Sequence, residues 1–376
     1  MIALNHTDFY RKLARDLPTL LLGNTEHDGY TQKEWTELFK LLNYHGLISF
    51  FVHFGGLENF MVNPELKELF HKRAKNIAAA NLKKMAVQRE VQEMLNKENI
   101  SFTLLKGLNL SVLLYENPAI RPLIDIDILL EKKDEQKVRK LMEKNGATQS
   151  NPLQNTFVQN LGDHEVPLNY NEVIIELHHQ LMPGINSIND DSTFEYEINN
   201  TTLKTFNPVF YLFYLCYHAQ KHLEAGKIKF LWYVDILCLI KKFCATTSQI
   251  DEILNLARQY GYEEQIKNTF YIIDEFFKEY FEKRIIPDNV NTEYYQTFKK
   301  LISQNKPEIP ESYYLKKLNK LNTRNKFRYI MGIFFPSIRY IKARFKLKYT
   351  FFAVLVLIIN PVRVIIKLLY RLIRKL

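Results

Sequence analysis

Glycine and proline are scarce in this chain of 376 residues, which contains 12 of the first and 13 of the second. A fold built only of strands needs many tight turns and more of both residues, so this composition argues against it. Apolar residues make up 47% of the chain and aromatic residues 13%, which is enough to fill real cores. Long segments rich in Leu, Lys and Glu predict that helix dominates. We therefore expect an α+β protein.

Cysteine is also rare. The chain has three cysteines, Cys216, Cys238 and Cys244. Their number is odd, and their spacing is that of neither a metal site nor a disulfide framework. They predict buried thiols in a reducing compartment. The first residues of the chain show no basic segment followed by an apolar run, so we expect no signal peptide and a cytoplasmic protein.

Acidic residues are missing from residues 312–376, which hold 16 of the 51 Lys and Arg residues. The preceding part of the chain therefore carries more acidic than basic residues. A basic tail on an acidic body argues against a nucleic-acid groove across the catalytic part, so we predict no specific nucleic-acid partner. The tail instead predicts a partner of its own.

The tail also lacks an uncharged run long enough to span a membrane. Its longest such run, Tyr349–Val362, has 14 residues and includes Pro361, whereas a spanning helix needs about 17–25. From Val364 onward the cations are spaced as in an amphipathic basic helix. We predict that residues 339–376 bind an anionic membrane surface, at the inner face of the cell membrane. The alternatives are a helix that packs on the acidic body and, third, a short transmembrane anchor.

Two carboxylates lie within the apolar run Ile124–Leu130. The run alternates with period 2, so it predicts a strand that presents Asp125 and Asp127 on one face. Asp is a poor strand former, and such local violations tend to mark function. Two carboxylates that face one site repel each other unless a cation neutralises them, and hard oxygen ligands favour Mg²⁺ or Mn²⁺. The alternative is a solvated strand face, because Asp-x-Asp is common by chance.

A strand, a turn and a helix precede these aspartates. Phe102–Leu105 predicts a short buried strand, Lys106-Gly107 a turn, and Leu108–Tyr115 a helix whose free N–H groups face the turn. This is a phosphate-binding geometry. Lys106 is expected to neutralise phosphate charge there, and Arg121 either to bind phosphate oxygens or to orient one of the aspartates.

These residues, Lys106-Gly107, Tyr115, Arg121 and Asp125-x-Asp127, resemble the uncharacterised bacterial nucleotidyltransferases of the DNA polymerase beta-like superfamily. The resemblance implies a small mixed-sheet nucleotidyltransferase core, surrounded by predominantly helical N- and C-terminal regions. It implies transfer of a nucleoside monophosphate from an NTP to an unidentified acceptor hydroxyl, with Mg²⁺ or Mn²⁺ as the cofactor. Most of the superfamily has Gly-Ser where this chain has Lys-Gly, so the hydroxyl contact to phosphate is missing.

The resemblance also implies a third carboxylate on a later strand. His164–Tyr170 and Val173–His178 predict a hairpin, and period 2 places Glu176 and His178 on one face. Glu176 matches the last acidic position of the superfamily in order, so we expect it to complete the metal site with Asp125 and Asp127. His178 is either a neighbour of the metal or a structural residue at the strand end.

A later pair of helices carries a second group of polar residues. His218 and His222 are spaced i, i+4 on a predicted helix Pro208–His222, and Asp235 lies on the next one. Members of the resembling family often show this His-x-x-Lys-His pattern followed by an Asp. We expect these residues to line the acceptor side of the cleft, and the alternative is a set of buried hydrogen bonds between two helices. No Glu follows His218, so a zinc hydrolase is the weakest interpretation.

These elements predict four parts of the chain, which are a helical N-terminal region at 1–95, a nucleotidyltransferase-like core at 96–200, a helical domain at 201–310 and a basic, hydrophobic tail at 311–376. His45 and His53 in the first part are expected to be core or surface residues. Residues 285–310, with three prolines, predict a linker or irregular loop.

The alternative function is a non-catalytic, membrane-associated protein that binds nucleotide or another partner and keeps the fold. The missing Gly-Ser hydroxyl and the basic tail favour it. A third hypothesis is an aminoglycoside-modifying or toxin-like transferase, which differs only in its acceptor.

Overall fold

The structure of the chain is a computed structural model. It describes residues 30–54, 56–115, 117–149, 165–182, 185, 193–198, 201–244, 246–277, 285, 292–302, 322–336, 338, 341–342, 345, 347 and 349–373. The chain divides into two compact units, one of residues 1–127 and 181–310 and the other of residues 128–180 and 311–376. The four predicted parts of the chain have other borders, and they stay predictions.

Helices fill the N-terminal part of the first unit. They are α2 (Gln32–His45), α3 (Ile48–Phe54), the short 3₁₀ helix η1 (Leu57–Asn59) and α4 (Pro64–Lys97). A capping box begins α2, because the Thr31 hydroxyl accepts from the Glu34 amide while the Glu34 carboxylate accepts from the Thr31 amide. His45 is fully buried and His53 is exposed, so neither of them belongs to the site described below.

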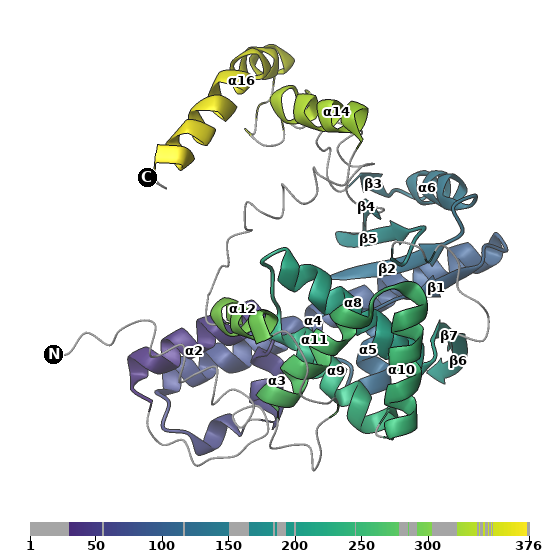
Figure 1. Cartoon of the computed structure of the whole chain (residues 1–376), viewed down its shortest axis with the longest axis vertical. Coiled ribbons are helices and arrows are strands. Elements are labelled where there is room, and N and C mark those ends of the chain that lie inside the picture. The colour runs from purple at the N-terminus through teal and green to yellow at the C-terminus, as the bar shows by residue number, and fades with distance from the viewer. Residues whose placement is uncertain are drawn as a thin grey trace. The chain divides into compact units, whose positions relative to one another are not determined.

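A five-stranded sheet has the strand order β1-β2-β5-β4-β3 (Figure 1). Its elements along the chain are β1 (Phe102–Leu104), α5 (Leu108–Leu114), β2 (Asp125–Leu130), α6 (Glu135–Lys144), β3 (Thr148–Gln149), β4 (Glu165–Tyr170) and β5 (Val173–His178). The expected fold class is confirmed: an α+β protein with a small mixed sheet and predominantly helical N- and C-terminal regions.

The predicted hairpin before His178 is confirmed. Strands β4 and β5 pair antiparallel, with Tyr170 opposite Val173 and Glu165 opposite His178. Asn171 and Glu172 join them at φ angles of 50° and 64°. Two consecutive residues with positive φ are typical of the two-residue turn whose twist matches that of the strands.

A second hairpin was not predicted. Strands β6 (Thr193–Ile198) and β7 (Thr201–Phe206) pair antiparallel in a separate two-stranded sheet. The alternation of Phe194, Tyr196 and Ile198 with polar residues is the sequence signal for it. The Thr205 hydroxyl donates to the Leu104 carbonyl, which ties β7 to β1.

The rest of the first unit is helical and includes α8 (Pro208–Glu224), α9 (Phe230–Phe243), α10 (Thr247–Tyr260), α11 (Glu263–Phe276) and α12 (Thr292–Ile302). Helix α8 is almost fully buried and packs against the other four. Helix α12 corrects the prediction of a linker at residues 285–310. Its Phe298, Leu301 and Ile302 are buried, so their packing holds a helix between the prolines.

Two helices are described in the C-terminal part of the second unit, α14 (Thr323–Phe334) and α16 (Thr350–Ile373). Helix α16 continues through Pro361, which therefore does not end it. Among the described residues, no helix has the length and apolar content needed to span a membrane.

Candidate functional site

The turn at Lys106-Gly107 is held in place by its neighbours. The Leu105 amide donates to the Asp127 carbonyl over 3.2 Å, and the Tyr211 hydroxyl donates to the Leu105 carbonyl. Gly107 has φ 63° and ψ −122°, a conformation that side-chain-bearing residues rarely adopt. A Cβ at this position would also lie 3.4 Å from the Asp125 carbonyl oxygen. The backbone conformation explains why a glycine follows Lys106.

The segment that leads into β2 is anchored by a residue far away in the sequence. Asn81, buried on α4, donates from its Nδ2 to the carbonyls of Ala119 and Arg121. Its Oδ1 accepts from the Leu123 amide over 3.0 Å. Sequence reasoning missed Asn81, although a polar residue on the apolar side of a helix is the signal that points to it.

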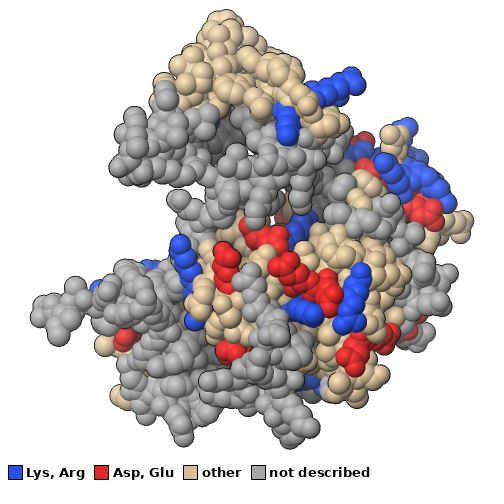
Figure 2. All heavy atoms as spheres, viewed as in Figure 1, with Lys and Arg blue, Asp and Glu red and all other residues tan. Residues whose placement is uncertain are grey.

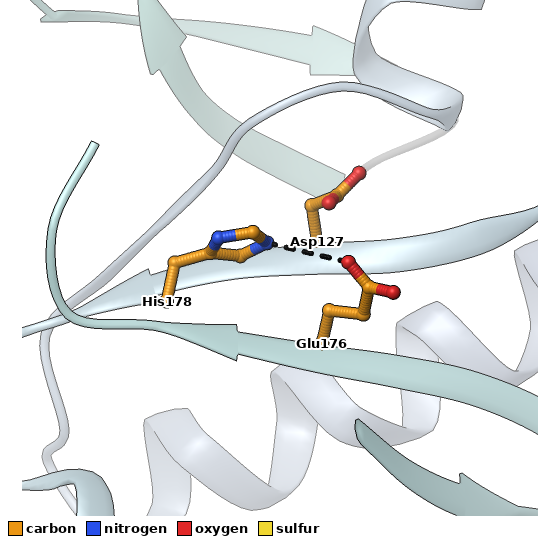
Figure 3. A group of neighbouring side chains, drawn as sticks. All are labelled: Asp127, Glu176 and His178. Atoms are coloured by element: carbon orange, nitrogen blue, oxygen red, sulfur yellow. Dashed lines mark ion pairs between the residues drawn. The ribbon is translucent and has the colours of Figure 1, made fainter. Parts of the chain in front are cut away.

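Three side chains on neighbouring strands converge in this structure. Asp127 on β2 and Glu176 and His178 on β5 each offer one ligand atom, and these atoms all lie within 4.8 Å of one another (Figure 3). The Nε2 of His178 lies 3.8 Å from Oε2 of Glu176. Asp127 and His178 are buried, and Glu176 is partly exposed. The structure thus brings together the predicted Asp127, Glu176 and His178.

Asp125 is not a member of this cluster. It lies at the start of β2 and is partly exposed. Burial lowers the pKa of Lys84 on α4, and the charge of Asp125 opposes that shift, so the two groups are close enough to interact. The expected role of Asp125 as a metal ligand stays a prediction.

Lys106 interacts with groups on two different elements. Its Nζ lies 3.2 Å from Oδ1 of Asp127 and 3.5 Å from Nε2 of His218 on α8. Only 18% of the Lys106 side chain is exposed, which strengthens its interaction with the buried carboxylate. Lys106 therefore also neutralises part of the charge on Asp127.

His218 and His222 form a pair, as their spacing on one helix face predicts. Their Nε2 atoms lie 3.1 Å apart, so one imidazole donates and the other accepts. Burial lowers the pKa of His222 to about 3, and the positive charges of Lys221 and Lys106 act in the same direction. His222 is therefore neutral at physiological pH. The Trp232 ring on α9 packs on both imidazoles, with centroid distances of 5.1 Å to His218 and 4.8 Å to His222.

Arg121 and Asp235 bind each other. The Nε and Nη2 atoms of Arg121 donate to the Asp235 carboxylate over distances of 2.8 to 3.1 Å. The Tyr115 hydroxyl donates to the same carboxylate over 2.7 Å. Burial alone would lower the pKa of Arg121, but the charge of Asp235 raises it above its usual value. The ion pair of Arg121 is thus with Asp235 and with neither Asp125 nor Asp127, and its expected contact with phosphate stays a prediction.

The model of a family described as uncharacterised nucleotidyltransferase matches residues 31–278. No curated protein sequence matches the chain. Among solved structures, an antigenic nucleotidyltransferase-like protein from Paracoccidioides brasiliensis is similar, with 14% sequence identity and a TM-score of 0.29 over 52% of this chain and 91% of that chain. The matched range of the family model includes the Lys106-Gly107 turn, both aspartates of β2, Glu176, His178 and the histidine pair of α8. Because the family model covers more than half of the sequence, the chain belongs to the family of uncharacterised nucleotidyltransferases.

Proposed function

We propose that the chain transfers a nucleoside monophosphate from an NTP to an acceptor hydroxyl and needs a divalent cation to do so. The observation that carries this proposal is the cluster of Asp127, Glu176 and His178, whose ligand atoms lie within 4.8 Å of one another in a member of a nucleotidyltransferase family. A lysine beside the cluster adds the positive charge that polyphosphate binding requires.

The donor set fits Mn²⁺ and Mg²⁺. Two carboxylates are ligands that both ions accept, and the imidazole of His178 suits the softer Mn²⁺ better. Asp127, Glu176 and His178 would hold the ion. A bound divalent cation would neutralise charge on the phosphate oxygens and on the leaving pyrophosphate.

Lys106 and the histidine pair have separate roles in this proposal. Lys106 donates to a phosphate oxygen of the NTP and gives up part of its interaction with Asp127. His222, with a pKa of about 3, stays neutral at physiological pH and orients its neighbour through the contact between their Nε2 atoms. His218, which contacts Lys106, lies on the acceptor side in this proposal, and the proton of the acceptor hydroxyl passes to solvent.

The first test is thermal unfolding with each NTP, with Mg²⁺, with Mn²⁺ and without metal. A ligand present at about 100 times its dissociation constant stabilises the folded chain by about 2.7 kcal/mol, which is readily measured. We expect this stabilisation to require metal and to disappear in Asp127→Asn and Glu176→Gln. Asp251→Asn, an exposed carboxylate on α10, is the matched control and should behave as wild type. Metal-dependent stabilisation that survives both site substitutions would contradict the proposed metal site.

A second candidate is a protein that binds nucleotide and does not turn it over. The ion pair of Lys106 with Asp127 favours it, because the lysine engages a carboxylate oxygen that a catalytic metal would need. The Lys106-Gly107 turn also lacks the serine of the wider superfamily. Release of pyrophosphate separates the two candidates, since only the transferase produces it.

A further inference from the structure

The two C-terminal helices bury small side chains and expose large ones. Gly332 of α14 and Ala353 of α16 are buried. Asn360 of α16 is 5% exposed, and its amide donates to the Phe334 carbonyl at the end of α14 over 2.9 Å. Asn360 thus links α16 to the end of α14.

The large apolar side chains of the same helices face outward. Phe351 is 68% exposed and Ile358 is 66% exposed, while Ala353 between them is fully buried. The other exposed apolar residues of the two helices are Phe327, Ile330, Met331, Phe352, Val354, Leu355, Ile359, Val362, Ile365 and Ile366. A helix of a water-soluble protein normally has the opposite arrangement, and an exposed apolar surface of this extent marks an interaction site.

The apolar and cationic positions of α16 lie on different sides of the helix. At about 100° per residue, the exposed apolar positions centre on the side opposite Ala353 and Asn360. In the sequence, Arg363, Lys367 and Arg371 recur every four residues, and the described Arg363, which is partly buried, lies on the other half of the helix. The guanidinium of Arg363 lies 5.1 Å from the ring centroid of Phe345. Separate apolar and cationic sides are typical of helices that lie in a membrane interface.

The charge around this surface has one sign. Residues 312–376 contain no Asp or Glu. On the face shown in Figure 2, the described part of α14 and α16 carries blue side chains among tan ones and no red ones. The described helices are too short or too polar to span a bilayer, so a membrane contact here is one along its surface.

We propose that the exposed apolar surface of α14 and α16 docks on an anionic lipid bilayer. The apolar side chains enter the boundary of the acyl chains, and the lysines and arginines bind headgroup phosphates. A second copy of the chain fits this surface less well, because two surfaces that carry only positive charge repel each other. The proposal does not depend on the transfer reaction.

The test is flotation of the full-length chain, synthesised in the presence of lipid vesicles. One set of vesicles contains phosphatidylcholine alone, and the other adds phosphatidylglycerol. We expect binding to the anionic vesicles to be at least about tenfold stronger than to the neutral ones, and to weaken at high salt. Equal flotation with both sets of vesicles, or with neither, would overturn the proposal.

Substitutions locate the binding surface. We expect the combined variant Phe351→Ser, Ile358→Ser and Val362→Ser to bind at least about tenfold more weakly, since it removes three exposed apolar side chains. Leu82→Ser, at an exposed apolar position of α4, is the matched control and should float as wild type does. The surface is not a membrane site if the triple variant floats unchanged. It is a contact between copies if light scattering shows a dimer that the triple variant loses while the wild type does not float.

Discussion

The ammonium group of Lys106 lies 3.2 Å from Oδ1 of Asp127, so a cation supplied by the chain itself contacts the carboxylate of the proposed metal site. The two residues come from the turn before α5 and from β2, and the backbone pairing of Leu105 with Asp127 brings them together. A lysine in this position competes with a metal ion and attracts a polyphosphate. Removing the lysine should therefore raise the affinity for the metal ion and lower the affinity for the polyphosphate, so the two effects can be measured separately.

We expect Lys106→Gln to bind Mn²⁺ about tenfold more tightly in the absence of nucleotide, because one competing charge beside Asp127 is removed. We expect the same variant to bind an NTP together with Mn²⁺ about tenfold more weakly, because a phosphate contact is lost. Titration calorimetry measures both affinities. Lys40→Gln, which removes an exposed lysine of α2, is the control and should change neither. A Lys106→Gln variant that loses affinity for Mn²⁺ alone would contradict the competition.

The ion pair of Arg121 with Asp235 is expected to stabilise the first unit. Both side chains are almost fully buried, and removing one partner leaves the other charged in a medium of low dielectric constant. We expect Arg121→Met and Asp235→Leu each to lower the free energy of unfolding by about 3–5 kcal/mol. Urea denaturation measures the loss.

The double variant of this pair is the informative comparison. With both charges gone, the chain should be clearly more stable than the sum of the two single losses predicts, by about 1–3 kcal/mol. Tyr115→Phe, which removes only a hydroxyl donor to Asp235, should cost about 1 kcal/mol. Losses that simply add would show that the two side chains act independently, and the coupling would then be absent.

Local patterns predicted the parts of the site that depend on neighbours in the sequence. Period 2 placed Glu176 and His178 on one face of a strand, and the structure confirms that both side chains reach Asp127. A glycine after Lys106 predicted a turn, and the positive φ of Gly107 is its physical reason. Each of these features is decided within a few residues by backbone geometry.

Contacts between distant segments were not predictable in this way. Arg121 and Asp235 are 114 residues apart, and no local pattern indicates which carboxylate a buried arginine meets. Asn81 anchors the segment before β2 from a helix about 40 residues earlier, and one asparagine among the many polar residues of α4 is a weak signal. The prediction of a linker at residues 285–310 gave too much weight to prolines, which all lie outside α12. Tertiary packing of Phe298 decided that segment.

His45 should make the stability of the first unit depend on pH. Its Nε2–H donates to the Ile302 carbonyl over 3.0 Å, and its Nδ1 accepts from the Phe230 amide over 3.1 Å. Only the neutral imidazole satisfies both partners. Burial accordingly lowers the pKa of His45 to about 3, and the hydrogen bond to Ile302 opposes that shift only in part.

The direction of the pH effect on stability follows from which state of the chain, folded or unfolded, binds the proton more tightly. The unfolded chain protonates this imidazole below about pH 6.5, whereas the folded chain resists protonation down to about pH 3. The stabilisation is therefore complete above the unfolded pKa and is lost as the pH falls toward the folded one, at up to about 1.4 kcal/mol per pH unit. Urea denaturation at about pH 7.5 and about pH 5.5 measures it. His45→Gln should reduce the difference between the two conditions, and His53→Gln, at an exposed position, should not.

Trp232 should report nucleotide binding by its fluorescence. Its ring packs on His218 and His222, and His218 in turn contacts Lys106. If Lys106 turns toward a phosphate, the hydrogen bonding of His218 changes beside the indole, and the emission of Trp232 changes with it. The second tryptophan of the chain, Trp35, is 2% exposed in the core of the N-terminal helices, so it serves as an internal reference.

We expect the emission to change when an NTP is added with Mn²⁺, to change equally in Trp35→Phe, and to stay constant in Trp232→Phe. Calorimetry on the same samples shows whether nucleotide is bound. Bound nucleotide without a change in Trp232 emission would mean that Lys106 keeps its contact with His218 when the site is filled. The histidine pair would then be a structural contact between α8 and α9, and the acceptor would have to be recognised by other residues.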